Sequence, residues 1–101
     1  MTAIRRILLQ RRGSTPVAVS STKGHHGHSL GATESMEFVA TALAVKNGCV
    51  PATLGLESPE PGFEDIDLVS GSSRKQEIRT ALSNSFAFGG NAAAIAMERA
   101  D

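Results

Sequence analysis

Three histidines within four positions, His25, His26 and His28, are the first candidates for chemistry in this sequence. They lie in residues 21–31, a segment so rich in glycine and polar side chains that it predicts a functional loop without regular structure. Metal binding needs two or three ligands that converge, and no carboxylate lies within the loop to complete a site. Zinc or nickel binding is therefore a minor alternative to solvated loop histidines.

His28 differs from its neighbours because it lies between Gly27 and Ser29, just before a predicted helix. A neutral imidazole at this place would donate a hydrogen bond to a developing oxyanion, and the positive end of the helix dipole favours the neutral ring. Lys23, earlier in the same loop, would order the loop or tune its electrostatics. The alternative for Lys23 is an ordinary surface lysine.

A second candidate site is the run Asn-Ser-Phe-Ala-Phe-Gly-Gly over residues 84–90. Its glycines permit backbone conformations that other residues avoid, and amides at such a corner can face a ligand. Phe88, beside Gly89 and Gly90, would gate a pocket. Periodicity alone favours a simpler interpretation, a hairpin with two phenylalanines in its core.

The composition is that of one small globular domain. The 101 residues are 41% hydrophobic but only 4% aromatic, with no Trp or Tyr, so the core must consist of Ala, Val, Ile and Leu. Ten basic and ten acidic residues leave no net charge, which argues against nucleic acid or a lipid surface as partner. The signs are segregated, because the basic residues dominate the first third and acidic residues crowd positions 57–67.

Cys49 is the only cysteine, which excludes an internal disulfide and a cysteine-based zinc site. A single cysteine weakly favours a reducing compartment.

Arginines interrupt the apolar face of residues 1–12, so we expect no signal peptide. No run approaches the roughly 20 apolar residues of a membrane span. We therefore expect a soluble, cytoplasmic protein.

Two helices are predicted. Residues 2–12 have the apolar period of an amphipathic helix, ended by Gly13, and a short buried strand follows at 17–20. The second helix, residues 33–46, begins at Thr33 with acidic residues in its first turns. It is apolar around most of its circumference, so we expect it to be buried on more than one side.

The second half of the chain predicts strands. Residues 51–62 hold three prolines and predict a surface connection, and 66–69 is a candidate short strand. Apolar runs at 77–85 and 92–97 flank the Gly-Gly corner and predict a hairpin. The fold class expected from these elements is α/β.

The loop and the corner occur in an order that is found in a known protein family. The segments 19–23 and 27–32, the long helix, the Pro51 connection and the 84–90 corner together resemble the C-terminal end of the beta-ketoacyl-acyl carrier protein synthases. The resemblance covers nearly the whole chain. It implies that residues 1–101 are one C-terminal domain fragment of a thiolase-like layered fold, in which sheets and helices cover the 33–46 helix.

The resemblance also implies an activity, the decarboxylative condensation of an acyl thioester with malonyl-acyl carrier protein in fatty acid or polyketide biosynthesis. His28 resembles the histidine that binds the malonyl thioester carbonyl and stabilises the enolate, and Lys23 the conserved lysine of that loop. Phe88, followed by Gly89 and Gly90, resembles the gating phenylalanine whose amide contributes to the oxyanion hole. The family needs no metal and no cofactor.

The family's nucleophilic cysteine and first catalytic histidine are expected upstream of Met1, and Cys49 is no substitute, so we expect the chain to be inactive alone. The expected partners are acyl carrier protein with its acyl and malonyl thioesters, and a second copy or the remaining N-terminal part. A non-catalytic subunit that docks on a complete synthase is the alternative. Arg5 and Arg6 would contact an acidic carrier protein.

Three residues depart from the family's pattern: His26, Ala87 and Asn91. His26 stands where the family often has threonine, and Asn91 follows Gly90 directly where a Thr-Asn pair is usual. Ala87 replaces a preferred glycine, so its Cβ would restrict the swing of Phe88.

Overall fold

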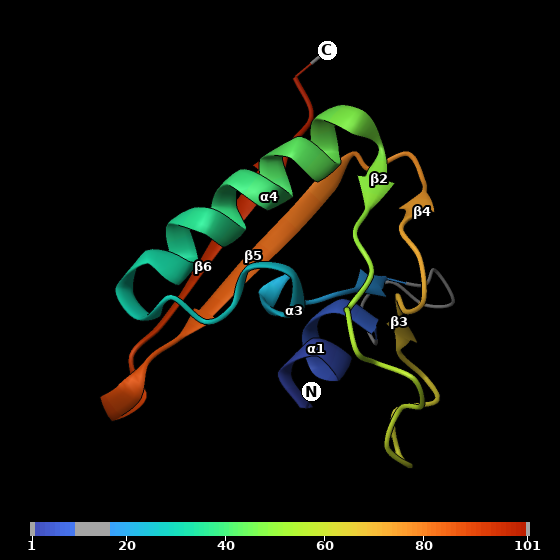
Figure 1. Ribbon diagram of the computed structural model, residues 1–101, viewed down its shortest axis with the longest axis horizontal. Coiled ribbons are helices and arrows are strands. Elements are labelled where there is room, and N and C mark those ends of the chain that lie inside the picture. The colour runs from blue at the N-terminus through green and yellow to red at the C-terminus, as the bar shows by residue number, and fades with distance from the viewer. Residues whose placement is uncertain (1, 10–16, 101) are drawn as a thin grey trace.

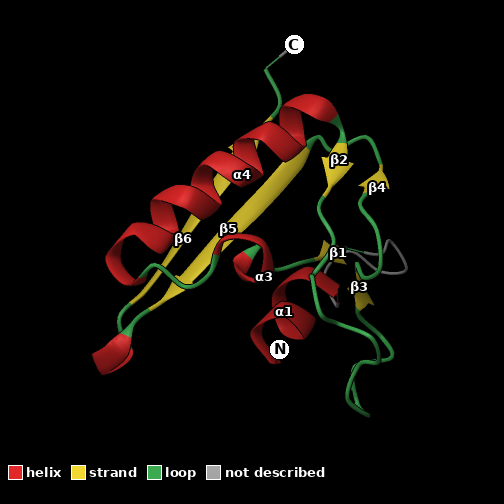
Figure 2. Ribbon diagram, viewed as in Figure 1, coloured by secondary structure: helices red, strands yellow, loops and turns green. Residues whose placement is uncertain are grey.

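The computed structural model describes residues 2–9 and 17–100 (Figure 1). They form an α/β arrangement with one long helix, one long hairpin and several short elements (Figure 2). The elements in chain order are α1 (Thr2–Ile4), η1 (Arg5–Leu9), β1 (Ala18–Val19), α3 (Lys23–His26), η2 (Leu30–Ala32), α4 (Thr33–Asn47), β2 (Cys49–Val50), β3 (Asp67–Leu68), β4 (Arg74–Lys75), β5 (Thr80–Phe86), η3 (Phe88–Gly90) and β6 (Ala92–Glu98).

The hairpin of β5 and β6 forms one layer and α4 lies along it, in contact with both strands (Figure 1). The strands are antiparallel, with a register that runs from Thr80 opposite Glu98 to Phe86 opposite Ala92. The predicted hairpin is therefore confirmed. Its two phenylalanines are not core residues, because Phe86 is 78% and Phe88 91% exposed.

Short strand pairs form the other side of the molecule. β1 and β3 are parallel, with Ala18 opposite Asp67, and both fall within predicted strand segments. β2 and β4 are antiparallel, with Val50 opposite Arg74, and neither was predicted. Strands of two residues are too short to show a sequence period.

The core is small and lies beside these short strands. It consists of Val50, Ala52 and Val69, with Ala18 and Ile78 packed against it. Val45 and Ile66 are also buried. The prediction of a core of small aliphatic side chains is confirmed.

Helix α4 was predicted correctly in position, and Gly48 ends it in the left-handed conformation with φ of 60°. The prediction of burial on more than one side is wrong for the chain itself. Only Thr33 and Val45 of α4 are buried, while Val39 and Leu43 remain 54% and 51% exposed. Among the described residues the hairpin covers one face of α4 and the 21–31 segment contacts another, while the face with Val39 and Leu43 lacks a covering layer.

Two further expectations need correction. The predicted 2–12 helix is seen as α1 followed by the wider π-helical turn η1, and residues 10–13 lie outside the described part. The 21–31 loop is not irregular throughout, because α3 and η2 each add one short helical turn. Among the residues that the structure describes, no helix has the length and apolar character needed to cross a membrane.

Candidate functional site

His28 lies between α3 and η2 with its ring held through one nitrogen. Its Nδ1 is 3.1 Å from the backbone nitrogen of Leu30 and 3.0 Å from Oγ1 of Thr33. A backbone N–H only donates, so Nδ1 accepts and the neutral ring carries its proton on Nε2. The side chain is exposed, and no hydrogen bond within the described part of the chain uses Nε2. His28 therefore presents Nε2–H as a free donor.

Leu30, which donates to His28, has an unusual backbone conformation. Its φ is 48°, and it is the only non-glycine residue of the described chain with a positive φ. That conformation costs a leucine about 1–2 kcal/mol, because its Cβ crowds the following carbonyl.

Lys23 is held by α4. Its ammonium forms an ion pair with Oε1 of Glu37, whose side chain is only 13% exposed, whereas that of Lys23 is 41% exposed. Thr33 and Glu37 lie one turn apart, so they share a face of α4. This one face therefore contacts both candidate residues of the loop, Thr33 on His28 and Glu37 on Lys23.

The other two histidines face different partners. His25 donates from Nε2 to the carbonyl of Ala52 at 2.9 Å. His26 donates from Nδ1 to its neighbour Gly27 at 2.9 Å, and its Nε2 lies 2.9 Å from the hydroxyl of Thr22. The described residues contain no group of three His, Cys, Asp or Glu side chains able to hold a metal ion. The part of the chain that the structure describes therefore offers no ligand set for zinc or nickel.

The corner at Phe88–Gly90 is a separate structure at the end of the hairpin. Gly89 and Gly90 have φ of 83° and 84°, which favours glycine at both positions. Ala87 N–H donates to the carbonyl of Asn91 at 2.8 Å and closes the turn. Ala87 itself is extended, with φ of −124°, so its Cβ causes no backbone strain in this conformation.

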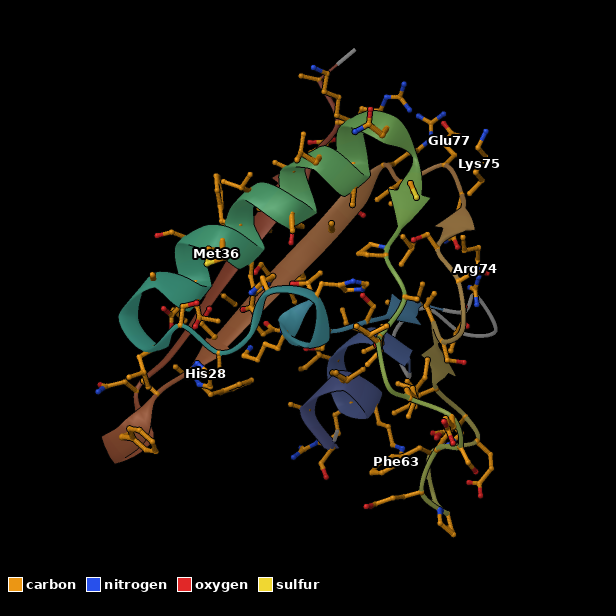
Figure 3. All side chains as sticks on the ribbon, viewed as in Figure 1. His28, Met36, Phe63, Arg74, Lys75 and Glu77 are labelled. Carbon is orange, nitrogen blue, oxygen red and sulfur yellow. The ribbon has the colours of Figure 1, made fainter. Side chains whose placement is uncertain are left out.

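Residues 21–31 are called the histidine loop below. No hydrogen bond among the described residues joins this loop to the corner. They do lie toward the same end of the molecule, since α4 starts near the end of the hairpin that carries the corner (Figure 1). Figure 3 shows His28 below the loop that leads into α4, on the side where the corner lies. The structure thus places Lys23 and His28 against one face of α4. Phe88 lies apart from them and is exposed.

Arg5 has an internal partner. It binds Asp65 through two bonds, Nε to Oδ2 at 2.8 Å and Nη2 to Oδ1 at 2.9 Å, and it also donates to the carbonyl of Gly62. Its guanidinium lies 5.5 Å from the ring centroid of Phe63. The hydrogen bonds from Arg5 hold the pKa of Asp65 below its usual value. Arg5 is therefore engaged within the chain rather than free for an acidic partner.

Comparison with known proteins identifies the family. Residues 1–57 match the model of the beta-ketoacyl synthase C-terminal domain. The chain belongs to the beta-ketoacyl synthase family. A solved beta-ketoacyl synthase from Burkholderia phymatum STM815 superposes with a TM-score of 0.80 at 30% identity, covering 85% of this chain and 21% of that one. The expected α/β, thiolase-like fold is confirmed.

Other relatives extend the match beyond residue 57. The 3-oxoacyl-acyl-carrier-protein synthase 2 of Vibrio harveyi is 43% identical over 91 residues, which is 90% of this chain and 22% of that protein. Nodulation protein E of Rhizobium meliloti is 36% identical over 98 residues, which is 97% of this chain and 24% of that protein. This synthase chain spans about a fifth of the length of these relatives.

Two residues of the site were missed by sequence reasoning, Thr33 and Glu37. Both were interpreted only as signals for the start of a helix. Thr33 does not cap its own helix, because Ala32 is the N-cap and no side chain bonds there. Their spacing of four positions placed them on one helix face, which was the signal available in the sequence.

Proposed function

We propose that this chain is the C-terminal segment of a 3-oxoacyl-acyl-carrier-protein synthase and supplies the malonyl-binding half of its active site. The observation that carries the proposal is the free Nε2–H of His28, fixed by the N–H that Leu30 donates to Nδ1. A neutral imidazole with this tautomer is a hydrogen-bond donor to a carbonyl oxygen. The 3-oxoacyl-acyl-carrier-protein synthase relatives support acyl carrier protein as the carrier of both thioesters.

In this proposal His28 acts on the malonyl thioester. Nε2–H donates to the thioester carbonyl oxygen, and the bond between the carboxylate carbon and its neighbour breaks. Carbon dioxide leaves, the electron pair of that bond forms the enolate, and negative charge grows on the oxygen that faces His28. A donor placed at this oxygen stabilises the transition state more than the ground state. The enolate carbon then attacks the carbonyl carbon of the acyl thioester. A carbon–carbon bond forms, and the carbon–sulfur bond breaks with the thiolate as leaving group.

The acyl thioester and its nucleophilic cysteine would come from protein outside these 101 residues. Cys49 is half-buried in β2, paired opposite Lys75, and it belongs to the strand rather than to the histidine loop. Lys23 holds the loop through Glu37, so its charge is already matched by a carboxylate. We assign Lys23 to positioning of the loop.

Phe88 is proposed as the gate of the acyl site. It is 91% exposed at the tip of the hairpin, and the two glycines that follow it allow the backbone to change conformation. Its amide would contribute to the oxyanion hole when the rest of the site is present. The extended conformation of Ala87 is compatible with this role.

A graft tests the proposal. The matched segment of the Vibrio harveyi synthase is replaced by this chain, and cysteine acylation and malonyl decarboxylation are measured separately. His28→Ala should lower decarboxylation by about 10²–10³-fold, the usual effect of losing one oxyanion donor. Acylation should persist. Loss of acylation with intact decarboxylation would overturn the assignment of His28.

The second candidate function is a non-catalytic subunit that docks on a complete synthase. The apolar side chains left exposed on α4 favour it, among them Met36, Phe38 and Val39. Mixing the chain with a Vibrio harveyi synthase that lacks its matched segment separates the two functions. Recovered condensation supports the segment, whereas binding only to the complete synthase supports the subunit.

A further inference from the structure

Thr33 has an unusual environment for a hydroxyl. It is 2% exposed and is the only buried polar residue in the described part of the chain. A threonine at a helix start ordinarily satisfies a free N–H of its own helix, but Ala32 occupies that place in α4. The hydroxyl lies instead 3.0 Å from Nδ1 of His28.

The direction of this hydrogen bond follows from the other contact on Nδ1. Leu30 N–H donates to Nδ1, so that nitrogen carries no proton in the neutral ring. The Thr33 hydroxyl must therefore donate as well. A hydroxyl this deeply buried is removed from competing water, and a buried donor that lost its partner would be costly. Two donors from two segments thus converge on one nitrogen of His28.

We propose that Thr33 is a positioning residue that, together with the Leu30 N–H, fixes the tautomer and the ring orientation of His28. Rotating the ring by half a turn would put carbon where Nδ1 accepts, and both donors would lose their partner. A proton on Nδ1 would point at the Leu30 N–H, which cannot accept it. Each alternative is disfavoured, so the ring keeps Nε2–H directed outward. Only the catalytic consequence of this arrangement rests on the proposed function.

The position of Thr33 on α4 adds a second constraint. Glu37 lies one turn further along the same face and binds Lys23. The first turns of α4 therefore hold the loop at two points, one neutral and one charged. Because the strained φ of 48° at Leu30 needs support from its surroundings, these two contacts also help to hold the chain in that conformation.

Nitrogen NMR of the 101-residue chain tests the proposal directly. Long-range proton–nitrogen spectra, recorded where the rings are neutral, should show His28 with its proton on Nε2 and with Nδ1 accepting a hydrogen bond. Thr33→Val keeps the shape of the side chain but removes the hydroxyl, so the Nδ1 resonance should move toward that of a free acceptor. Thr33→Ser keeps the hydroxyl and should restore the wild-type position.

Two outcomes overturn the proposal. One is a wild-type ring with both tautomers populated or with the proton on Nδ1. The other is an Nδ1 resonance that Thr33→Val leaves unchanged. Amide spectra of each variant show whether it is folded. If Thr33→Val does not fold, Thr33→Ser remains informative.

The graft into the Vibrio harveyi synthase keeps this proposal separate from the proposed function. There Thr33→Val should lower the kcat of decarboxylation about fivefold without raising KM, which is the effect of one lost hydrogen bond of about 1 kcal/mol. Thr33→Ser should restore it. If the NMR result holds but His28→Ala leaves decarboxylation intact, the function is wrong and the positioning role stands.

Discussion

The ammonium of Lys23 and the carboxylate of Glu37 meet across the gap between the histidine loop and α4, where Glu37 is only 13% exposed. The pair joins two elements that the sequence places on either side of His28. Its loss would leave the loop held to α4 by the contact between His28 and Thr33.

Glu37→Gln tests the ion pair because it removes the charge and keeps the shape. We expect the free energy of unfolding to fall by about 1 kcal/mol, the upper range for a partly exposed pair. Urea denaturation at low and high salt measures it, and salt should reduce the difference. Glu34→Gln, in the first turn of the same helix, is the control and should have a smaller effect. Equal effects of the two variants would contradict the ion pair.

Gly24→Ala tests the packing of α3 against the 51–56 segment. A Cβ at Gly24 would lie 2.8 Å from the carbonyl oxygen and 2.9 Å from the Cβ of Leu54, so α3 must move. We expect a loss of about 1–3 kcal/mol in the free energy of unfolding, typical of overpacking. Gly31→Ala is the matched control, because nothing lies within 4 Å of its Cβ position. A harmless Gly24→Ala would show that α3 does not pack there.

Val69→Ala tests the small core. Val69 is 1% exposed, and removing two methyl groups there should cost about 2 kcal/mol from lost burial and the cavity left behind. Val39→Ala is the control, since Val39 is 54% exposed on α4 and the same atoms are lost. Its cost should stay within about 0.5 kcal/mol. Denaturation midpoints of the two variants, measured under the same conditions, give the two losses of stability for comparison.

The Asp67–Arg74 ion pair predicts a dependence of stability on pH. Arg74, which is labelled in Figure 3, binds both oxygens of Asp67 at 2.6 and 2.9 Å and joins β4 to β3. These bonds hold the pKa of Asp67 below its usual value. The folded state therefore binds this proton less readily than the unfolded state. The stabilisation is present above the ordinary aspartate pKa of about 3.9 and is lost as pH falls through the lower folded pKa. Asp67→Asn should flatten the unfolding profile in that range, and an unchanged profile would exclude the pair.

The sequence predicted the elements that have a clear apolar period or that are bounded by glycines. The helix from Thr33 and the hairpin around Gly89-Gly90 were correct, because a long apolar run and paired glycines are local signals. β2 and β4 were missed, since pairs such as Val50 with Arg74 depend on contacts far apart in the chain. Burial of Phe86 was wrong for a related reason, because an aromatic residue does not itself show whether a layer covers it.

The candidate site was predictable in part. His28 and Lys23 carried a recognisable spacing, and their resemblance to a family supplied roles that no pattern gives. Glu37 and Thr33 were hidden because their types already suited a helix start, and only the folded backbone reveals which loop residue each one contacts. The partner of Arg5, Asp65, was unpredictable because a distant acidic residue has no local signature.

The hairpin has a consequence for the behaviour of the isolated chain. Within the described residues β5 and β6 pair only with each other, so each strand keeps one side of unpaired N–H and C=O groups. Such an edge is a template on which another extended chain can add a strand. The inner residues of β6, mostly alanine, offer little bulk or charge to prevent it. A concentrated solution of the chain would therefore be prone to aggregate by edge-to-edge strand pairing. An added Lys or Pro on β6 would oppose this aggregation.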